Sequence, residues 1–592
     1  MLARSLRLAF LLFLSAGLIA CLGSSSGTSK NSPNNPTANI TSLSITPNNS
    51  AVTVGKTLQF SAEATYSDGS KKDVTSTTVW QTSDPSVATV STGVVTGLKA
   101  GLITVRAGSG SVTATTLLNV TSKQFSKSSL NGAYVLTLLT GMGAPSIQLE
   151  AGSISADGNG NVKGEEDING PSGVVTSVSL SGTYTITADG RGTLSLTTTG
   201  QAARTFRFVL YSNPSGANNG VLIEFDGVHN AMGKLEKQDQ TAFTNTALAN
   251  ATYVFREGGL DSSQHNLSVV GEFATDSTGS VVSSGEEDVN DNGTINNGAG
   301  SSTPLPLSGG TIGAIDGTSG RATMSLTGNV TGKSDFALYI VSDNRIEMLG
   351  LDADPVQATA EKQSSPAPSS VGAGGYVFLT DMGGVTGQFW MEGQMGFDNT
   401  SHFTEGVAFQ DGGINFAFVT PAASFTITNG RGTFQQTTNH GTLACVAYLV
   451  SASEMYLLQT NDVHAASGIA QLQSPGPDGF NAASLNNTFV ASAAEIGDGN
   501  VAFVAEFVSD GLGHIFGIED VSQPQAGNPS KLTVSTVGFV AASTAPNVIG
   551  GISFNISSSG TGVTSLAALL VSSNSAVLVG QPNDADGIFV VQ

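Results

Sequence analysis

The sequence predicts an all-β protein of several domains, and three observations carry this prediction. Apolar and polar residues alternate in short runs, with a turn signal about every eight to twelve positions and no segment of helical period. Glycine occurs 73 times, and 11% of the residues are charged where about 25% is usual. Beyond residue 130 a degenerate pattern returns about every 120 residues. A chain of 592 residues is also too long for one hydrophobic core.

The N-terminus has the features of an export signal. Two arginines precede an apolar run over residues 8–14, which leads to Leu18-Ile19-Ala20-Cys21. This arrangement resembles the signal peptide of bacterial lipoproteins. The resemblance implies that residues 1–20 are removed by cleavage between Ala20 and Cys21, and that the Cys21 thiol carries a lipid. A retained transmembrane helix is the alternative, but it needs about 20 apolar residues and this run is shorter.

Residues 21–37, which begin with Cys21, are rich in Ser, Gly, Asn and Pro. Such a composition cannot bury enough apolar surface to fold, so the segment is predicted to be a flexible tether. No aspartate follows Cys21, and by the same resemblance this implies sorting to the outer membrane or cell surface.

Residues 38–121 alternate in the manner of half-buried strands. The strings Val79-Trp80-Gln81-Thr82-Ser83-Asp84-Pro85 and Gly93-Val94-Val95-Thr96-Gly97 resemble the bacterial Ig-like domain of group 2. The resemblance implies an Ig-like β-sandwich with Trp80 in its core and no catalytic residues.

The chain contains two cysteines, Cys21 and Cys445. If Cys21 carries the lipid, no intramolecular disulfide can form. Cys445 stands in an apolar strand-like run and is predicted to be a small buried hydrophobic residue rather than a nucleophile.

The rest of the chain is predicted to contain four copies of one β-repeat, over 130–239, 248–363, 372–473 and 485–592, of which the fourth is diverged. Each copy begins with a short motif that ends in an aromatic residue: Leu130-Asn131-Gly132-Ala133-Tyr134, Leu248-Ala249-Asn250-Ala251-Thr252-Tyr253, Gly374-Gly375-Tyr376 and Leu485-Asn486-Asn487-Thr488-Phe489. About eight short strands per copy favour tandem antiparallel meanders, either small up-and-down barrels or sandwiches.

An acidic element and a turn with arginine recur inside the copies. The acidic elements are Gly164-Glu165-Glu166-Asp167, Gly285-Glu286-Glu287-Asp288, Thr404-Glu405-Gly406 and Ile518-Glu519-Asp520. The turns carry Arg191, Arg321 and Arg431, and the fourth copy lacks this arginine. We expect each arginine either to reach back to the acidic element of its own copy or to be solvated.

The second acidic element extends into a possible calcium loop. Asp288, Asn290 and Asn292 alternate before Gly293, as oxygen ligands do in the first half of such loops. The glutamate expected at the twelfth position is replaced by Ala299, so any calcium site would be weak, and an ordinary hairpin is the competing interpretation. No other cofactor is predicted, since the six histidines show no metal-binding spacing.

These features predict a non-enzymatic lipoprotein of the cell envelope that is anchored in the membrane by its lipid. Its β-domains would serve adhesion or the binding of carbohydrate or surface proteins. The formal charge of −22 argues against nucleic acid as a partner. Two alternatives stay open: an enzyme with a site between β-domains, and a purely structural stalk.

Overall fold

A computed structural model of the chain describes residues 39–591 with gaps. The residues outside the description are 1–38, 49, 122–124, 141–146, 213–215, 227–230, 299, 329–332, 382–390, 411–413, 418–424, 439–440, 462–464, 475–487, 496–500, 510–513, 523–529, 533–537, 540, 543–550, 555–565, 573–574, 581–587 and 592. The predicted signal peptide, the cleavage position Ala20/Cys21 and the tether lie outside the described residues.

The first domain is an Ig-like sandwich of short strands. One sheet has the order β2-β10-β9-β6, formed by Ser50–Thr53, Val112–Thr121, Gly101–Ser109 and Val79–Thr82. The other layer combines β1 (Ile40–Thr46), β4 (Ser61–Tyr66) and β5 (Lys71–Asp73) with β3 (Thr57–Gln59), β8 (Val94–Gly97) and β7 (Ala88–Ser91). Alternation along β4 buries Ala62 and Ala64 and exposes Ser61 and Glu63, because successive side chains of a strand point to opposite faces.

Trp80 lies at the margin of this core. The core is centred on Phe60, which is fully buried, and Trp80 packs against it half-buried with ring centroids 6.5 Å apart. The indole Nε1 donates to the Thr75 carbonyl oxygen at 2.9 Å. The resemblance had placed Trp80 inside the core. The indole remains at the margin because its N–H is bound to a surface turn.

Units 1 and 2 are closed β-barrels. Unit 1 follows the chain from β11 to β18: Asn131–Thr140, Gln148–Asp157, Asn161–Gly170, Gly173–Ile186, Arg191–Thr198, Arg204–Ser212, Asn218–Glu224 and Ala231–Lys237. Unit 2 runs from β19 to β28: Thr252–Leu260, Asn266–Thr275, Val281–Asp291, Thr294–Ile295, Leu305–Leu307, Gly309–Ile312, Arg321–Thr327, Lys333–Ser342, Arg345–Gly350 and Val356–Lys362. In both, the first strand pairs with the last, which removes exposed sheet edges.

In units 3 and 4 the main strands again follow one another along the chain in an antiparallel meander. Unit 3 comprises β29 to β37: Gly374–Asp381, Met391–Phe397, Phe403–Gln410, Ile414–Ala417, Thr426–Thr428, Arg431–Thr438, Gly441–Ser451, Glu454–Gln459 and Ser467–Leu472. Unit 4 comprises β38 to β47: Thr488–Glu495, Val501–Ser509, His514–Ser522, Ser530–Leu532, Gly538–Phe539, Ala541–Ala542, Gly551–Phe554, Leu566–Ser572, Ser575–Gly580 and Ile588–Val591. First and last strands pair here too. The predicted all-β fold is thus confirmed, and the meanders curl into barrels or half-barrels.

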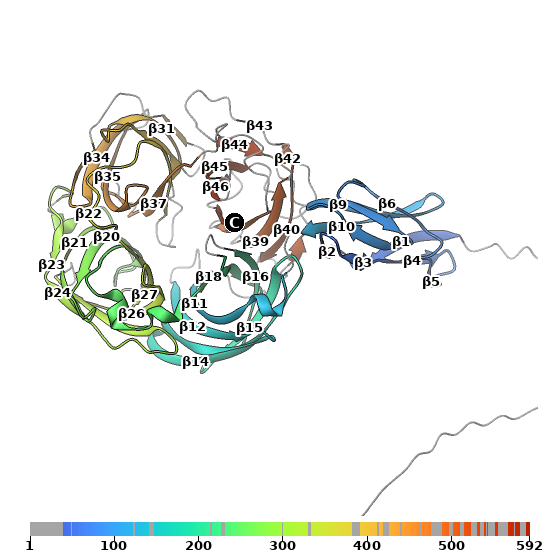
Figure 1. Cartoon of the computed structure of the whole chain (residues 1–592), viewed down its shortest axis with the longest axis horizontal. Helices are drawn as coiled ribbons and strands as arrows, with labels where there is room; N and C mark the ends of the chain where they lie inside the picture. Colours follow the sequence, from blue (N-terminus) through green and yellow to red (C-terminus); the bar gives the residue numbers. More distant parts are fainter. Residues whose placement is uncertain are drawn as a thin grey trace, which may run out of the picture.

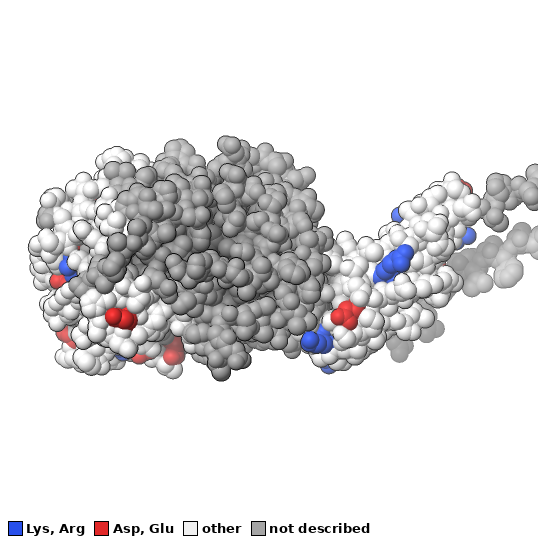
Figure 2. All heavy atoms as spheres, turned by 90° about the horizontal axis from the view of Figure 1, so that it is seen from above, with Lys and Arg blue, Asp and Glu red and all other residues white. Residues whose placement is uncertain are grey.

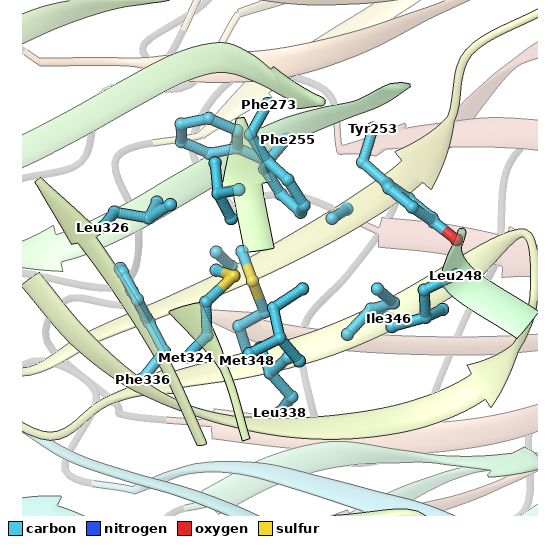
Figure 3. Close-up of a cluster of buried hydrophobic side chains, with 14 of the residues drawn as sticks. Leu248, Tyr253, Phe255, Phe273, Met324, Leu326, Phe336, Leu338, Ile346 and Met348 are labelled. Carbon is cyan, nitrogen blue, oxygen red and sulfur yellow. The ribbon is translucent and has the colours of Figure 1, made fainter. Parts of the chain in front are cut away.

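The recurring tyrosine that opens each of the first three units plugs its barrel. Tyr134, Tyr253 and Tyr376 are each almost completely buried, and the Tyr253 hydroxyl donates to the Asp343 carbonyl oxygen at 2.7 Å. In unit 2 the plug stands beside Phe255 and Phe273, while Met324 and Met348 fill the space opposite (Figure 3). Side chains therefore fill the barrel interior, as expected for eight strands.

The four units form a ring in which each packs on the next and the fourth returns to the first (Figure 1). Strands β11 and β12 lie against β26 and β27, and β19 and β20 lie against β35 and β36. Strands β38 and β39 close the ring against β16 and β17, and β29 lies against β45. Head-to-tail contacts of this kind make a closed ring when the rotation between neighbours adds up to a full turn.

Apolar clusters fill three of these interfaces. Units 1 and 2 join through Val135, Leu149, Ala337 and Tyr339; units 2 and 3 through Val254, Val270, Val446 and Tyr448; and units 4 and 1 through Val504, Ala502, Val209 and Tyr211. The Ig-like domain stands out from the side of the ring, with β9 against β39 and β40 of unit 4 (Figures 1 and 2). Within the described ranges no helix has the length and apolar character needed to cross a bilayer.

Candidate functional site between the units

The acidic element of unit 1 forms a buried contact with unit 2. Asp167 is fully buried, and its carboxylate accepts from Arg321 Nε at 2.7 Å and from Arg321 Nη2 at 2.9 Å. The Tyr339 hydroxyl donates to the same carboxylate at 2.6 Å. We call this arrangement the Asp–Arg–Tyr contact. A charge-assisted bidentate pair of this kind fixes both distance and orientation.

The same contact joins units 2 and 3. Asp288, also fully buried, accepts from Arg431 Nε at 2.7 Å and from Nη2 at 2.8 Å. The Tyr448 hydroxyl donates to it at 2.9 Å, and Asn296 Nδ2 donates at 2.7 Å. Two successive interfaces are therefore built by equivalent residues.

The expectation that each arginine reaches the acidic element of its own copy is wrong. Arg321 and Arg431 reach the preceding copy, because the aspartates and arginines lie on outer faces of their barrels and the outer faces of neighbouring units meet. Arg191 instead binds Asp189 of its own hairpin, with Nη2 2.8 Å from the carboxylate. None of these arginines is solvated, so the alternative interpretation is also wrong.

A glutamine after the last strand of a unit ties each of the first two interfaces. Gln238 accepts from Ser153 Oγ of unit 1 at 2.9 Å and donates to the Ile340 carbonyl oxygen of unit 2 at 2.7 Å. Gln363 donates to Glu272 of unit 2 at 3.1 Å and to the Leu449 carbonyl oxygen of unit 3 at 3.0 Å. The linkers are thus part of the interfaces.

Arg345 lies where units 1, 2 and 3 meet. Its Nε is 3.0 Å from Glu236 of unit 1, its Nη2 is 2.8 Å from Glu347, and its Nη1 binds Glu361. Glu454 of unit 3 is close enough to experience the charges of Glu361 and Arg345. We call these five residues the Arg345 hub.

The hub holds more carboxyl groups than one arginine can neutralise. Burial raises the pKa of Glu347 to about 7 against the opposing effect of Arg345. Burial and the charge of Glu361 raise the pKa of Glu454 to about 7. Glu347 and Glu454 therefore keep their protons under mildly acidic conditions, whereas Glu236 stays ionised beside Arg345, which lowers its pKa.

Carboxyl groups also occur inside the barrels. In unit 1, Arg204 Nη1 lies 2.7 Å from Glu150 and its Nε lies 2.7 Å from Glu224. Glu166 points to the same interior, accepts from Thr198 Oγ1 at 2.7 Å, and has its pKa raised to about 7 by burial and by the Glu150 charge. Arg204 therefore joins Glu150 and Glu224 inside the barrel, and Glu166 is held by Thr198.

The three predicted calcium ligands are placed differently from one another. Asp288 is engaged by Arg431, and Asn290 is fully buried with Nδ2 donating to the Gln459 carbonyl oxygen of unit 3 at 2.9 Å. Asn290 Oδ1 accepts from the Gly293 amide at 2.7 Å, and Asn292 occupies the turn with φ 47°. Calcium binding here stays a prediction, and it would require Arg431 to leave Asp288.

Cys445 is buried in the interior of unit 3, where burial raises the pKa of its thiol to about 12. This confirms the interpretation of a small core residue. The residues that sequence reasoning missed are the interface tyrosines and Arg345. Tyr339 and Tyr448 occupy equivalent positions, each paired across the sheet with the turn arginine of its unit, whereas unit 1 has Val209 at this position. Aligning the repeats residue by residue would have shown the two tyrosines.

Comparison with known proteins supports the description of the first domain. Residues 39–128 match the family model of the bacterial Ig-like domain (group 2). Ice-binding protein 1 of Shewanella frigidimarina (strain NCIMB 400) is 42% identical over 85 residues, which are 14% of this chain and 10% of that protein. The chain therefore spans about a tenth of that relative.

Among solved structures, transferrin binding protein B from Haemophilus parasuis Hp5 overlaps 65% of this chain and 84% of its own, at 9% identity and a TM-score of 0.15. Domains 4–9 of the surface layer protein SbsC overlap 93% of this chain and 82% of their own, at 11% identity and a TM-score of 0.14. TM-scores this low do not establish a shared architecture.

Proposed function

We propose that this chain is a non-enzymatic lipoprotein of the cell surface that displays a rigid ring of β-barrels for adhesion or ligand binding. The observation that carries the proposal is that the recurrent charged residues hold the units together. The acidic elements and turn arginines, which are the residues that catalysis would most readily use, bind one another between units 1 and 2 and between units 2 and 3. These residues therefore serve to fix the units to one another, which suits a protein that presents its surface to a partner.

The Ig-like domain supports the surface location. It stands outside the ring and is the first domain after the predicted tether, so it would separate the ring from the membrane. A lipid on Cys21 would supply the attachment. The domain's match to the bacterial Ig-like family and to part of an ice-binding protein agrees with a display role.

The anchor is tested by Cys21→Ser. We expect the variant to fold, to lose labelling by a palmitate analogue and to leave the membrane fraction. Continued labelling, or retention on membranes after a carbonate wash, would contradict the lipid anchor.

The binding role is tested with the soluble Cys21→Ser chain on a glycan array, on whole-cell surfaces and in an ice-recrystallisation assay. We expect saturable binding to at least one of these surfaces. A purely structural stalk would bind none of them. Turnover of a substrate that is lost on replacing one hub carboxyl, for example in Glu454→Gln, would favour the enzyme alternative.

A further inference from the structure

The interface that closes the ring, between units 4 and 1, lacks the Asp–Arg–Tyr contact. Asp520 is the counterpart of Asp167 and Asp288 and is equally buried, with 2% of its surface exposed. Its Oδ1 has no hydrogen-bond partner among the described residues. A buried carboxylate oxygen without a partner is costly, so the position needs a compensating group.

The cause lies in the turn of unit 1. Asp189 stands two residues before Arg191, where units 2 and 3 carry Ser319 and Asn429. Asp189 Oδ2 receives Arg191 Nε and Nη2, both at 2.8 Å, so the guanidinium is held within its own hairpin. Asp520 still lies close enough to raise the pKa of Arg191, but no ion pair joins them within the distance found at the other two interfaces.

Further oxygen atoms without partners surround this place. On the outer face of unit 4, Asp520 opposes Val504 and Ser522 opposes Ala502, so the side chains of Glu506, Asp520 and Ser522 share one face. Glu506 Oε2 and Ser522 Oγ are buried and have no hydrogen-bond partner among the described residues. Burial raises the pKa of Glu506 well above its usual value, and the Asp189 charge adds to the effect.

The Ig-like domain completes the cluster. The Asn119 side chain hydrogen-bonds the Glu506 carboxyl, as Gln363 does with Glu272 between units 2 and 3. Asn119 Oδ1 and Thr121 Oγ1 are buried without partners among the described residues, and both residues lie on the same face of β10. Oxygen atoms from the Ig-like domain and unit 4 thus gather beside the Asp189–Arg191 hairpin of unit 1.

We propose that this junction binds a divalent metal ion of the calcium type, held by Glu506 and Asp520 with the neutral side-chain oxygen of Asn119. We call it the junction site. Once Glu506 gives up its proton to bind a metal, the carboxylates of Asp189, Glu506 and Asp520 exceed the Arg191 guanidinium by two negative charges, which one divalent cation neutralises. Calcium prefers six to eight oxygen ligands and accepts amide, hydroxyl and water oxygens beside carboxylates.

Neutral oxygens are needed because, among the described residues, no three acidic, histidine or cysteine side chains are placed to hold a metal by themselves. Bound metal would lock the Ig-like domain to the ring at the point where the ring closes. The orientation of the ring on its spacer would then depend on extracellular calcium. This inference is independent of the proposed binding role.

The test is calorimetric titration of the Cys21→Ser chain with calcium and, separately, with magnesium, after treatment with a chelator. We expect saturable calcium heat, together with slower amide exchange in β10 when calcium is present. Glu506→Gln and Asp520→Asn should each weaken binding at least tenfold. Asp167→Asn is the matched control, because it removes a fully buried carboxylate at another interface and is not proposed to bind calcium, and it should leave this heat unchanged.

Asp189→Ser supplies a second, independent variant. It introduces the residue found in unit 2, frees Arg191 to reach Asp520, and should abolish calcium heat while raising the melting temperature of the metal-free chain. A protein that merely fails to fold could not give that result. The proposal is overturned if the parent chain shows no heat at 10 mM of either ion, or if the heat is as large in the Glu506→Gln/Asp520→Asn double variant as in the parent chain.

Discussion

Replacing Arg321 with methionine should destabilise the contact between units 1 and 2 far more than the loss of a surface ion pair does. Arg321→Met keeps the apolar stem and removes the guanidinium, which leaves the fully buried Asp167 carboxylate without a cation. Breaking a buried pair on one side costs about 3 to 5 kcal/mol. We expect the lower end, about 3 kcal/mol, because Tyr339 and the Ser177 amide still donate to Asp167.

Amide hydrogen exchange of the Cys21→Ser chain measures this cost locally, so it does not require the whole chain to unfold in one step. When local opening and closing are fast compared with exchange from the open form, a loss of about 3 kcal/mol makes exchange roughly 100-fold faster. We expect this change in β13 and β25, the two strands that carry the contact. Unit 4 should be unaffected.

Lys71→Ala is the matched control. Lys71 and Glu63 form an ion pair 2.7 Å long whose side chains are 64% and 48% exposed. Such a pair is worth about 0 to 1 kcal/mol, so exchange in β4 and β5 should change less than about fivefold. Adding Asp167→Asn to Arg321→Met removes the buried charge and should recover part of the loss. The reasoning is refuted if Arg321→Met accelerates exchange no more than Lys71→Ala does.

Three further predictions concern the hub, the spacer and calcium. The pKa values of Glu347 and Glu454 are raised to about 7 each, so the folded protein keeps two protons that the unfolded chain loses near pH 4.5. The stabilisation that comes from this proton binding is complete below pH 4.5 and is lost as the pH rises through 7. Melting temperatures from pH 5 to 8 should show this fall, and Glu347→Gln should flatten it; equal slopes would argue against proton binding at the hub. Trp80→Ala should lower the stability of the Ig-like domain by about 2 to 3 kcal/mol, which is less than the loss of a fully buried aromatic side chain costs, and amide exchange in the ring should not change. An Ig-like domain of unchanged stability would show that Trp80 does not support its core. Calcium should bind at Asp288, Asn290 and Asn292 with a dissociation constant no lower than about 0.1 to 1 mM, and Arg431→Met should strengthen this binding because it frees Asp288. Calcium-binding heat that does not change in Asp288→Ala would exclude this site.

The sequence predicted much of the fold because alternation and turn chemistry are local. The strand containing Ala62 and Ala64 followed from its pattern, and the burial of Cys445 followed from its apolar neighbours. The tyrosines that open the first three units marked the repeats because each fills a barrel interior at the same position.

The contacts between units could not be predicted in the same way. Asp167 and Arg321 are separated by 154 positions, and nothing local distinguishes a contact within a copy from one between copies. The sequence pattern does not reveal that the units form a ring, and the ring determines which outer faces of neighbouring units meet. Trp80 was misplaced for a related reason, because its indole hydrogen bond to Thr75 depends on a turn whose position the pattern does not specify.

The central claim is that the four units close into a ring, and a disulfide across the closing interface tests it most directly. Val221 of unit 1 and Ala502 of unit 4 belong to one buried apolar cluster although they are far apart in sequence. When Val221 and Ala502 are both replaced by cysteine in the Cys21→Ser chain, we expect a disulfide to form under mild oxidation, detected by gel mobility and peptide mass. Cysteines at Val254 and Ala502 should form no disulfide, because these residues lie in units on opposite sides of the ring. Units strung along the chain without closure would cross-link both pairs equally or neither, and that result would contradict the ring.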